Sequence, residues 1–252
     1  MISRPTQLKI AELAARIKLE NQNDIYTCFH AKRYATLISL LPPYLGSPNP
    51  TIMDVGRSQL TAELFKRFNV RVDSLGLEAD RQLETGHYYH MDLNDTQYQN
   101  LWPKNLPRYD VVIAAEVIEH LHVSPFWSFS FLKTLMNRTA VLIIQTPNAV
   151  VLHKRLIMLS GRNPFELIRD APSNPSHFRE YTVNELRQYA KKTGLMIINS
   201  VFGNYFDYRV LARNSVHRHL LSLVVHSYDV LPSSLRPGIT IVMRETERAT
   251  SS

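Results

Sequence analysis

Residues 109–120 read YDVVIAAEVIEH, which joins an apolar run to a cluster of two carboxylates and one imidazole. An apolar run flanked by polar residues is typical of a central strand that is covered on both faces. Glu116, Glu119 and His120 follow at the spacing i, i+3 and i+4, so one helical turn would point all three side chains the same way. Because α/β sheets bind ligands at the carboxyl ends of their central strands, we expect a functional site here.

Strand and helix patterns alternate on either side of this stretch, which predicts a parallel sheet with crossover helices. We expect strands at Thr51–Val55, Val70–Leu77, Tyr88–Met91, Tyr109–Ala115, Ala140–Gln145, Leu195–Val201 and Gly238–Arg244. We expect helices at Pro5–Leu19, His30–Leu41, Leu60–Phe68, Pro125–Met136 and Val183–Thr193. The final strand is expected to run antiparallel at the edge of the sheet.

The length of the chain indicates one domain, because 252 residues suffice for an α/β domain with a sizeable core. We therefore expect a single domain over residues 1–252, with N-terminal helices within 1–45. Two stretches, 149–176 and 204–237, break the alternation, and we interpret them as irregular insertions that form a lid and the acceptor region. The first contains the basic amphipathic piece His153–Leu159, which suits a lid or an interfacial helix.

The balance of charge favours an anionic partner, because the net charge is +7 and the pI is about 9.5. A phosphorylated substrate, nucleic acid or a membrane surface would fit; the alternative is that the charge only solvates the protein. The single cysteine, Cys28, excludes an internal disulfide framework and suits a reducing, cytoplasmic compartment. We expect neither a membrane span nor a secretory signal, because no apolar stretch approaches the ~18 residues that a span needs.

Acidic residues follow three of the predicted strands. Asp54-Val55-Gly56 ends the first strand just before a helix, where glycine allows a ligand to approach the backbone and the helix N-terminus. Glu78 follows the second strand, where a carboxylate suits the hydroxyl groups of a ribose. Asp92 follows the third strand and is placed to accept a hydrogen bond from an adenine amino group. Together they predict a nucleoside-binding edge.

Two later motifs, Thr146-Pro147-Asn148 and His177-Phe178-Arg179-Glu180-Tyr181, complete a resemblance to class I S-adenosylmethionine-dependent methyltransferases. The subgroup it resembles carries E-V-x-E-H after the fourth strand. The resemblance implies a Rossmann-like, seven-stranded, mostly parallel sheet with the last strand antiparallel, helices on both faces and an N-terminal helical cap. It also implies S-adenosylmethionine as cofactor, bound by Asp54, Gly56, Arg57, Ser58, Glu78, Asp92, Ala115 and Glu116. The family's turn usually reads D-x-G-x-G-x-G, and here Ser58 and Leu60 replace two glycines.

The cluster after the fourth strand has three interpretations. In the first, the catalytic residues are Glu116, His120 and His177. Glu116 lies beside the cofactor, and His120 or His177 is the general base that deprotonates the methyl acceptor. In the second, Glu116, Glu119, His120 and His177 are candidate ligands of a divalent metal, as in small-RNA 3′-terminal 2′-O-methyltransferases and some ubiquinone-pathway O-methyltransferases, which this arrangement resembles. In the third, Glu119 and His120 only cap the turn.

Three functions follow from these interpretations. The leading hypothesis is a cytoplasmic enzyme that methylates an oxygen of a small-molecule, glycan or lipid-linked acceptor. The alternatives are a metal-assisted RNA 2′-O-methyltransferase and a catalytically degenerate binding protein, the latter because of Ser58 and Leu60. Nucleic acid is the less favoured partner, since no basic tract interleaved with aromatic residues is present. Residues 150–159 are compatible with peripheral membrane contact.

Overall fold

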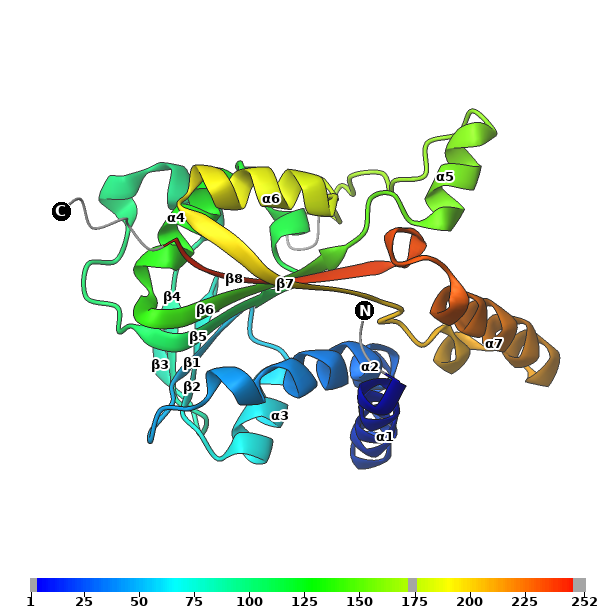
Figure 1. Cartoon of the computed structure of the whole chain (residues 1–252), viewed down its shortest axis with the longest axis horizontal. Coiled ribbons are helices and arrows are strands. Elements are labelled where there is room, and N and C mark those ends of the chain that lie inside the picture. Colours follow the sequence, from blue (N-terminus) through cyan, green and yellow to red (C-terminus); the bar gives the residue numbers. More distant parts are fainter. Residues whose placement is uncertain (1–3, 172–175, 247–252) are drawn as a thin grey trace. The chain divides into compact units, whose positions relative to one another are not determined.

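A computed structural model describes residues 4–171 and 176–246 of the chain, and all eight strands within them join one sheet (Figure 1). The order of the strands is β3-β4-β2-β1-β5-β6-β8-β7. Their bounds are β1 (Ile52–Val55), β2 (Val72–Gly76), β3 (Arg81–Gln82), β4 (His87–His90), β5 (Tyr109–Ala115), β6 (Met136–Pro147), β7 (Leu195–Gly203) and β8 (Gly238–Glu245). The predicted Rossmann-like fold is confirmed.

The central strands are parallel and in register at their carboxyl ends. Val55 of β1 lies beside Leu75 of β2 and Ala114 of β5, and Ala115 of β5 lies beside Gln145 of β6. All of β1 and the middle of β5 are buried, as the uninterrupted apolar runs predict for strands covered on both faces. The segments that leave β1, β2 and β5 therefore meet at one edge of the sheet.

Three helices pack beside this sheet, and local sequence signals fix where they begin. They are α3 (Gln59–Phe68), α4 (Pro125–Thr134) and α6 (Val183–Lys192), with α3 on one face and the other two on the opposite face (Figure 1). Ser124 caps α4 with Pro125 as its first residue, and Thr182 and Glu185 form a capping box on α6. Short 3₁₀ helices are η1 (Pro42–Tyr44), η2 (Leu93–Gln97), η3 (Gln99–Leu101), η4 (Ile118–His120), η5 (Tyr208–Leu211) and η6 (Ser233–Leu235).

The chain divides into two compact units. Unit 1 comprises Met1–Pro43, Val150–Pro164 and Val201–Ile239, and unit 2 comprises Tyr44–Ala149, Phe165–Ser200 and Thr240–Ser252. Unit 1 contains α1 (Arg4–Glu20), α2 (Ile25–Leu40), α5 (Leu152–Leu159) and α7 (Ser215–Val230). The expected N-terminal helices and much of both expected insertions thus belong to unit 1. Residues 172–175 of the first expected insertion lie outside the described residues.

The interpretation of 204–237 as irregular is wrong, because a helix of 16 residues, α7, occupies nearly half of that stretch. Its sequence, SVHRHLLSLVVHSYDV, is rich in valine, serine and histidine, which favour helices only weakly. Asn214 caps its N-terminus by accepting a hydrogen bond from the His217 amide (2.8 Å). Lys32 of α2 pairs with Asp229 at its other end (Nζ–Oδ1 3.0 Å). Contacts within unit 1 therefore stabilise a helix that intrinsic propensity does not predict.

Two further differences concern the edges of the sheet. The last strand, β8, was expected at the edge, but it lies between β6 and β7, so β7 is the edge strand. At the opposite edge, the two-residue β3 pairs antiparallel with β4 and brings the sheet to eight strands instead of seven. Of the helices in the described part of the chain, none combines the length and apolar character needed to cross a membrane.

Candidate active site

The turn after β1 is formed by Gly56, whose backbone lies in the left-handed region (φ 76°). Its N–H donates to the carbonyl of Leu75 in the neighbouring strand (2.9 Å), which fixes the turn at the edge of the sheet. A Cβ atom added to Gly56 would lie 3.1 Å from Cγ2 of Val117, in the turn that follows β5. Because both the dihedral angle and the close contact favour glycine, a side chain at this position would be strained.

Ser58 and Leu60 have structural roles that account for the absent glycines. The Ser58 hydroxyl accepts a hydrogen bond from the Leu60 amide (3.2 Å) and caps α3, while the Ser58 amide donates to Oγ1 of Thr61 (3.3 Å). Thr61 in turn donates its hydroxyl proton to the buried carboxylate of Asp54 (2.6 Å). Leu60 is buried, as expected for a residue that packs α3 onto the sheet. In place of the flexible backbone that glycine would give, the turn therefore has a serine side chain that caps the N-terminus of α3.

The other expected cofactor residues lie at the same edge of the sheet. Glu78 follows β2 with its side chain half exposed and paired with Arg81, and its backbone N–H donates to the Tyr88 hydroxyl (3.2 Å). Asp92 is partly buried and accepts a hydrogen bond from the Asn94 amide (2.8 Å), which caps η2. Arg57 is exposed. The binding roles of these residues stay predictions.

The segment after β5 does not form the single helical turn that its spacing suggested. Ala115, the last residue of β5, is partly buried. Glu116 adopts a left-handed conformation (φ 58°), and its amide donates to the carbonyl of Gln145 (2.7 Å). A 3₁₀ helix then covers only Ile118–His120. Glu116 therefore lies outside the turn that carries Glu119 and His120, and the expectation that one helical turn holds all three is wrong.

Glu119 connects the segment after β5 to the His177 motif through both its backbone and its side chain. Its carbonyl accepts hydrogen bonds from the amides of Phe178 (2.8 Å) and Arg179 (3.2 Å). Its carboxylate is buried and accepts a hydrogen bond from Oγ1 of Thr146 (2.9 Å) at the end of β6. Segments some sixty residues apart in the sequence are thereby held together, and His177 is placed beside His120.

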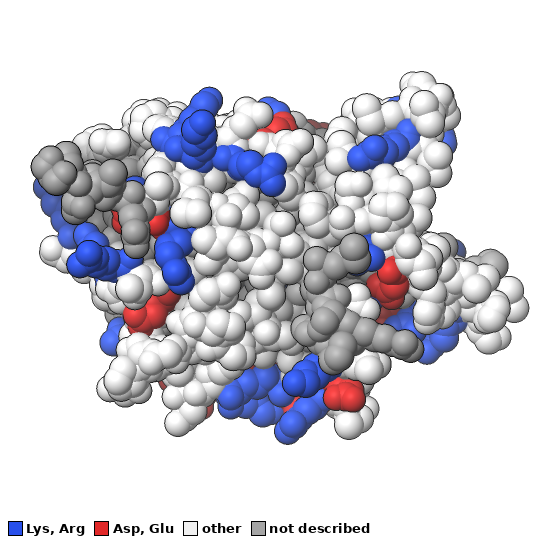
Figure 2. All heavy atoms as spheres, viewed as in Figure 1, with Lys and Arg blue, Asp and Glu red and all other residues white. Residues whose placement is uncertain are grey.

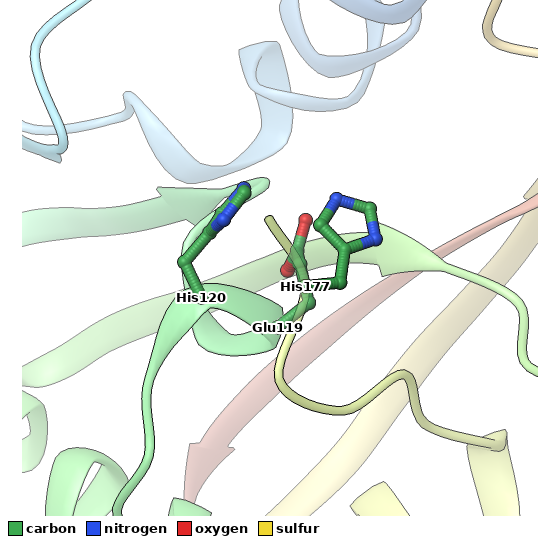
Figure 3. A group of neighbouring side chains, drawn as sticks. All are labelled: Glu119, His120 and His177. Carbon is green, nitrogen blue, oxygen red and sulfur yellow. The ribbon is translucent and has the colours of Figure 1, made fainter. Parts of the chain in front are cut away.

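His120 and His177 are in edge-to-face contact, with ring centroids 4.7 Å apart and an interplanar angle of 79° (Figure 3). Nδ1 of His120 lies 3.0 Å from the carbonyl oxygen of Ser176, so this nitrogen carries the proton and Nε2 keeps its lone pair. Burial lowers the pKa of His120, the Ser176 hydrogen bond opposes the shift, and His177 adds to it. A neutral imidazole of this kind is suited to accept a proton near neutral pH.

Glu119, His120 and His177 also form a group that is able to hold a metal ion. One ligand atom from each residue lies within 4.8 Å of the others, and the three side chains converge in Figure 3. The hydrogen bond from His120 to a backbone carbonyl, and the contact of His177 Nδ1 with Glu180 (3.2 Å), leave an Nε2 atom on each ring. Such outer contacts are typical of histidine ligands. Glu116, the fourth candidate, is not part of this group.

Three residues that help to build this site had been given no role by sequence reasoning. Ser176 supplies the carbonyl that orients His120, Glu180 contacts His177, and Thr146 contacts Glu119. Thr146 and Glu180 belong to the motifs Thr146-Pro147-Asn148 and His177–Tyr181, so the sequence offers a signal for both. The sequence offers no signal for Ser176, because any residue can supply a backbone carbonyl.

Comparisons with known proteins concern the family and the fold of the chain. Residues 26–200 match a family model described as a methyltransferase domain. One similar solved structure is a SAM-dependent methyltransferase from Archaeoglobus fulgidus, with a TM-score of 0.52, 15% identity, and coverage of 84% of this chain and 93% of that one. No curated protein matches the sequence.

The second is 1,6-didemethyltoxoflavin-N1-methyltransferase from Burkholderia thailandensis, with a TM-score of 0.50, 15% identity, and coverage of 98% of this chain and 92% of that one. The third is a geranyl diphosphate methyltransferase in complex with SAM, with a TM-score of 0.53, 12% identity, and coverage of 92% and 90%. At these identities the structural likeness concerns the fold alone.

Proposed function

The chain belongs to the methyltransferase domain family, and from this premise we propose that it moves a methyl group from S-adenosylmethionine to an oxygen of a small-molecule, glycan or lipid-linked acceptor. When bound, the cofactor supplies an electrophilic methyl group on a sulfonium centre. The observation that carries the proposal is the orientation of His120, whose Nδ1 is held by the Ser176 carbonyl within the cluster that follows β5.

The role of His120 in this proposal is to accept the acceptor's proton at Nε2. Its lowered pKa keeps the ring neutral at pH 7, so no proton has to leave before the reaction. The hydrogen bond to Ser176 fixes the ring orientation, and the edge of His177 limits its rotation. A fixed base of this kind acts mainly through proximity, because it is already placed when the acceptor binds.

On the cofactor side, the proposal assigns binding to the turn after β1 and to the ends of β2, β4 and β5. Gly56 leaves the backbone open, and Glu78 and Asp92 place carboxylates at the same edge for ribose and adenine. Ala115 and Glu116 line the junction with the proposed acceptor side, which is compatible with their partial exposure. The Ser58 cap supports binding without a second glycine, because it holds the helix N-terminus in place.

A small acceptor is supported by what is bound in similar structures. The Burkholderia enzyme holds 1,6-didemethyltoxoflavin together with S-adenosylhomocysteine. The choice of oxygen as the methylated atom rests on the presence of a general base, since a hydroxyl group must lose its proton on methylation.

Calorimetry with S-adenosylhomocysteine tests the cofactor assignment. Saturable binding is expected, and Glu78→Ala should weaken it by about 10-fold, the effect of a hydrogen bond to a charged group. Glu84→Ala is the matched control, since Glu84 is an exposed acid in the adjoining turn and should bind as the native chain does. Absence of binding at millimolar ligand would reject the enzyme and favour a binding protein.

A second candidate function, metal-assisted O-methylation, is favoured by the Glu119, His120 and His177 group. One carboxylate and two imidazoles suit Mn²⁺ or Zn²⁺, and each ligand has an outer contact that orients it. A metal held there would lower the pKa of the acceptor hydroxyl. His120 and His177 would then be ligands, and Glu119 would complete the set. An RNA 2′-hydroxyl is one acceptor compatible with this chemistry.

Titration of the chelator-treated protein with Mn²⁺ or Zn²⁺ separates the two candidates. The metal version predicts tight binding that His177→Ala removes and His122→Ala retains, because His122 is exposed and outside the group. Turnover that is indifferent to chelator, together with no difference between these variants in metal affinity, would reject the metal version and leave His120 as the base.

A further inference from the structure

The positive charge of the chain is carried by unit 1. By sequence, unit 1 has 13 Lys and Arg against five Asp and Glu, whereas unit 2 has the remaining 16 basic and 17 acidic residues. Unit 1 is therefore strongly basic and unit 2 nearly neutral, although unit 2 contains the candidate active site. On the face shown in Figure 2, Lys and Arg form separate groups with wide uncharged areas between them.

Unit 1 contains a pocket of about 700 Å³ between α1, the start of α2, η5 and the first half of α7. A cavity of this size is typical of small-molecule sites. Its lining includes four basic side chains and a single acidic one. The basic residues are Lys18, Arg209, Arg218 and His219, and the acidic residue is Asp207. Nothing in the proposed methyl transfer uses this pocket.

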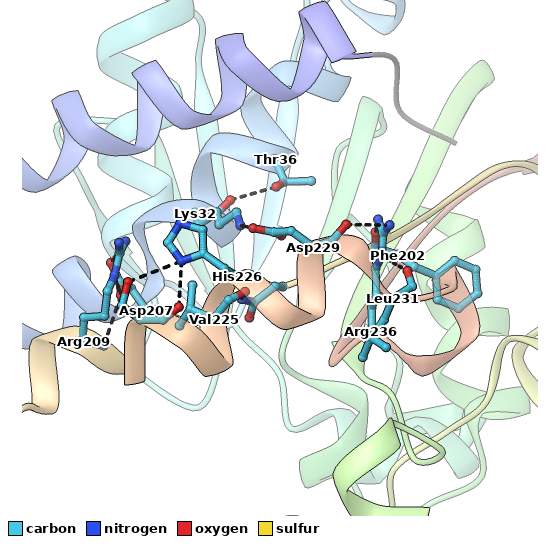
Figure 4. Close-up of polar contacts among 12 residues, drawn as sticks. Lys32, Thr36, Phe202, Asp207, Arg209, Val225, His226, Asp229, Leu231 and Arg236 are labelled. Carbon is cyan, nitrogen blue, oxygen red and sulfur yellow. Dashed lines mark hydrogen bonds and ion pairs between the residues drawn. The ribbon is translucent and has the colours of Figure 1, made fainter. Parts of the chain in front are cut away.

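Asp207 organises one wall of the pocket. Its side chain is nearly buried and pairs with Arg209 through two hydrogen bonds (Nε–Oδ1 2.7 Å, Nη2–Oδ2 2.8 Å) and with Nζ of Lys18. Figure 4 shows Asp207 and Arg209 beside α7. The Asp207 amide donates to the carbonyl of Phe29 (3.0 Å), so the wall is anchored to α2. Two cations bound to one carboxylate leave this rigid wall with a net positive charge.

Helix α7 adds to the lining the Arg218 guanidinium and the His219 ring. Arg218 and His219 lie in the second turn of α7 with exposed side chains, and no carboxylate of the described residues pairs with either. Ser215, the first residue of α7, also lines the pocket, so the positive end of the helix dipole lies beside it. The remaining lining is uncharged and includes the apolar side chains of Ile25 and Val210.

We propose that this pocket binds a phosphate-bearing ligand through Arg218, His219, Lys18 and Arg209. Phosphate matches the set because guanidinium groups present paired donors to its oxygens and because Arg218 has no carboxylate partner among the described residues. The apolar lining residues Ile25 and Val210 accommodate the organic part of such a ligand. A soluble phosphorylated compound and a phospholipid headgroup share this chemistry. A separate binding measurement tests each of these two sources of phosphate.

Calorimetry of the full chain with pyrophosphate tests the soluble source, and sedimentation with phosphatidylglycerol-containing vesicles, against phosphatidylcholine alone, tests the lipid source. In whichever measurement detects binding, Arg218→Gln should weaken it by at least about 10-fold, the effect of a lost charged hydrogen bond. Arg213→Gln removes the same charge nearby but outside the pocket lining, and should change the affinity by less than a factor of about two.

A second variant separates the pocket from the general effect of charge. Val210→Trp fills the pocket without altering the charge, and it should abolish binding as Arg218→Gln does. Unchanged melting temperatures of the Arg218→Gln and Arg213→Gln variants would show that the fold is intact. Equal loss in Arg213→Gln and Arg218→Gln, binding that survives Val210→Trp, or no binding to either millimolar pyrophosphate or the anionic vesicles would overturn the proposal. Binding of S-adenosylhomocysteine is independent of all these outcomes.

Discussion

The turns that follow β1 and β5 meet the same backbone requirement with different residues. The two strands are neighbours, and the chain leaves each through a residue in the left-handed region, Gly56 (φ 76°) after β1 and Glu116 (φ 58°) after β5. Glycine adopts this conformation freely, whereas glutamate does so at a cost of about 1 kcal/mol or more. The first turn is therefore organised around an open backbone and the second around side chains. This difference matches our proposal that the first turn serves the cofactor and the second the acceptor.

The largest effect should come from the second turn. His120→Ala removes the proposed base and should slow methyl transfer by about 10²- to 10⁴-fold, the usual contribution of general base catalysis. The affinity for S-adenosylhomocysteine should stay as in the native chain, because His120 is assigned to the acceptor side. His122→Ala, a change to an exposed histidine two residues on, is the control for rate and fold. A rate within a factor of about three of the native value would remove His120 from the mechanism.

In the first turn, Gly56→Val should act on binding instead. A β-branched residue is poorly compatible with φ 76°, and its Cβ would press on Cγ2 of Val117, so we expect about 1–3 kcal/mol of destabilisation. If a similar free energy is lost from binding, the affinity for S-adenosylhomocysteine should fall by about 100-fold. Gly46→Val is the control, because a Cβ there meets nothing within 4 Å and the φ angle is ordinary. Equal effects of both substitutions on affinity would contradict the role of the Gly56 turn.

The two turns should also differ in pH dependence: the rate of methyl transfer should depend on the protonation of His120, and the binding of S-adenosylhomocysteine should not. Because burial lowers the pKa of His120, the ring stays neutral below the ordinary value of 6.5, and the rate should fall by about 10-fold per unit only once the pH drops below the lowered pKa. The sign is the same for stability: the folded state disfavours protonation, so this contribution is present above pH 6.5 and is lost as the pH falls towards the folded-state pKa. The affinity for S-adenosylhomocysteine should not fall over the same pH range, and isothermal titration calorimetry at several pH values measures it. A parallel fall in affinity would contradict the assignment of His120 to the acceptor side.

The fold was predictable from the sequence, and so was the set of residues at the carboxyl edge of the sheet, because both depend on local patterns. The exact agreement of Tyr109–Ala115 reflects an apolar run that only a central strand explains, and the caps at Ser124 and Thr182 follow from short-range hydrogen bonds. The left-handed Glu116 was not predictable, since the spacing i, i+3, i+4 assumes helical geometry that tertiary contacts overrode. Helix α7 was not predictable for the same reason, because its contacts involve partners such as Lys32, far away in the sequence.

Glu116→Gly tests whether the strained residue is kept for its side chain. Glycine relieves the left-handed conformation but adds freedom to the unfolded chain, so the free energy of unfolding should rise by no more than about 1 kcal/mol. If the carboxylate serves the cofactor or the acceptor, turnover should nevertheless fall by about 10-fold, the equivalent of one charged hydrogen bond. Chemical denaturation and initial rates measure the two quantities. A more stable variant with native turnover would mean that Glu116 shapes the turn and does nothing else.

The smallest effect returns to the first turn and to the glycine that it lacks. Ser58→Ala removes the α3 cap and should cost about 1 kcal/mol, whereas Ser58→Gly, which restores the family's residue, should cost only a few tenths. If the hydroxyl serves only the helix, both variants should bind S-adenosylhomocysteine with native affinity, because each leaves Gly56 unchanged. Tighter binding by Ser58→Gly alone would show that the serine side chain crowds the cofactor. The comparison of the two turns would then change, since side chains would restrict the cofactor side as well as build the acceptor side.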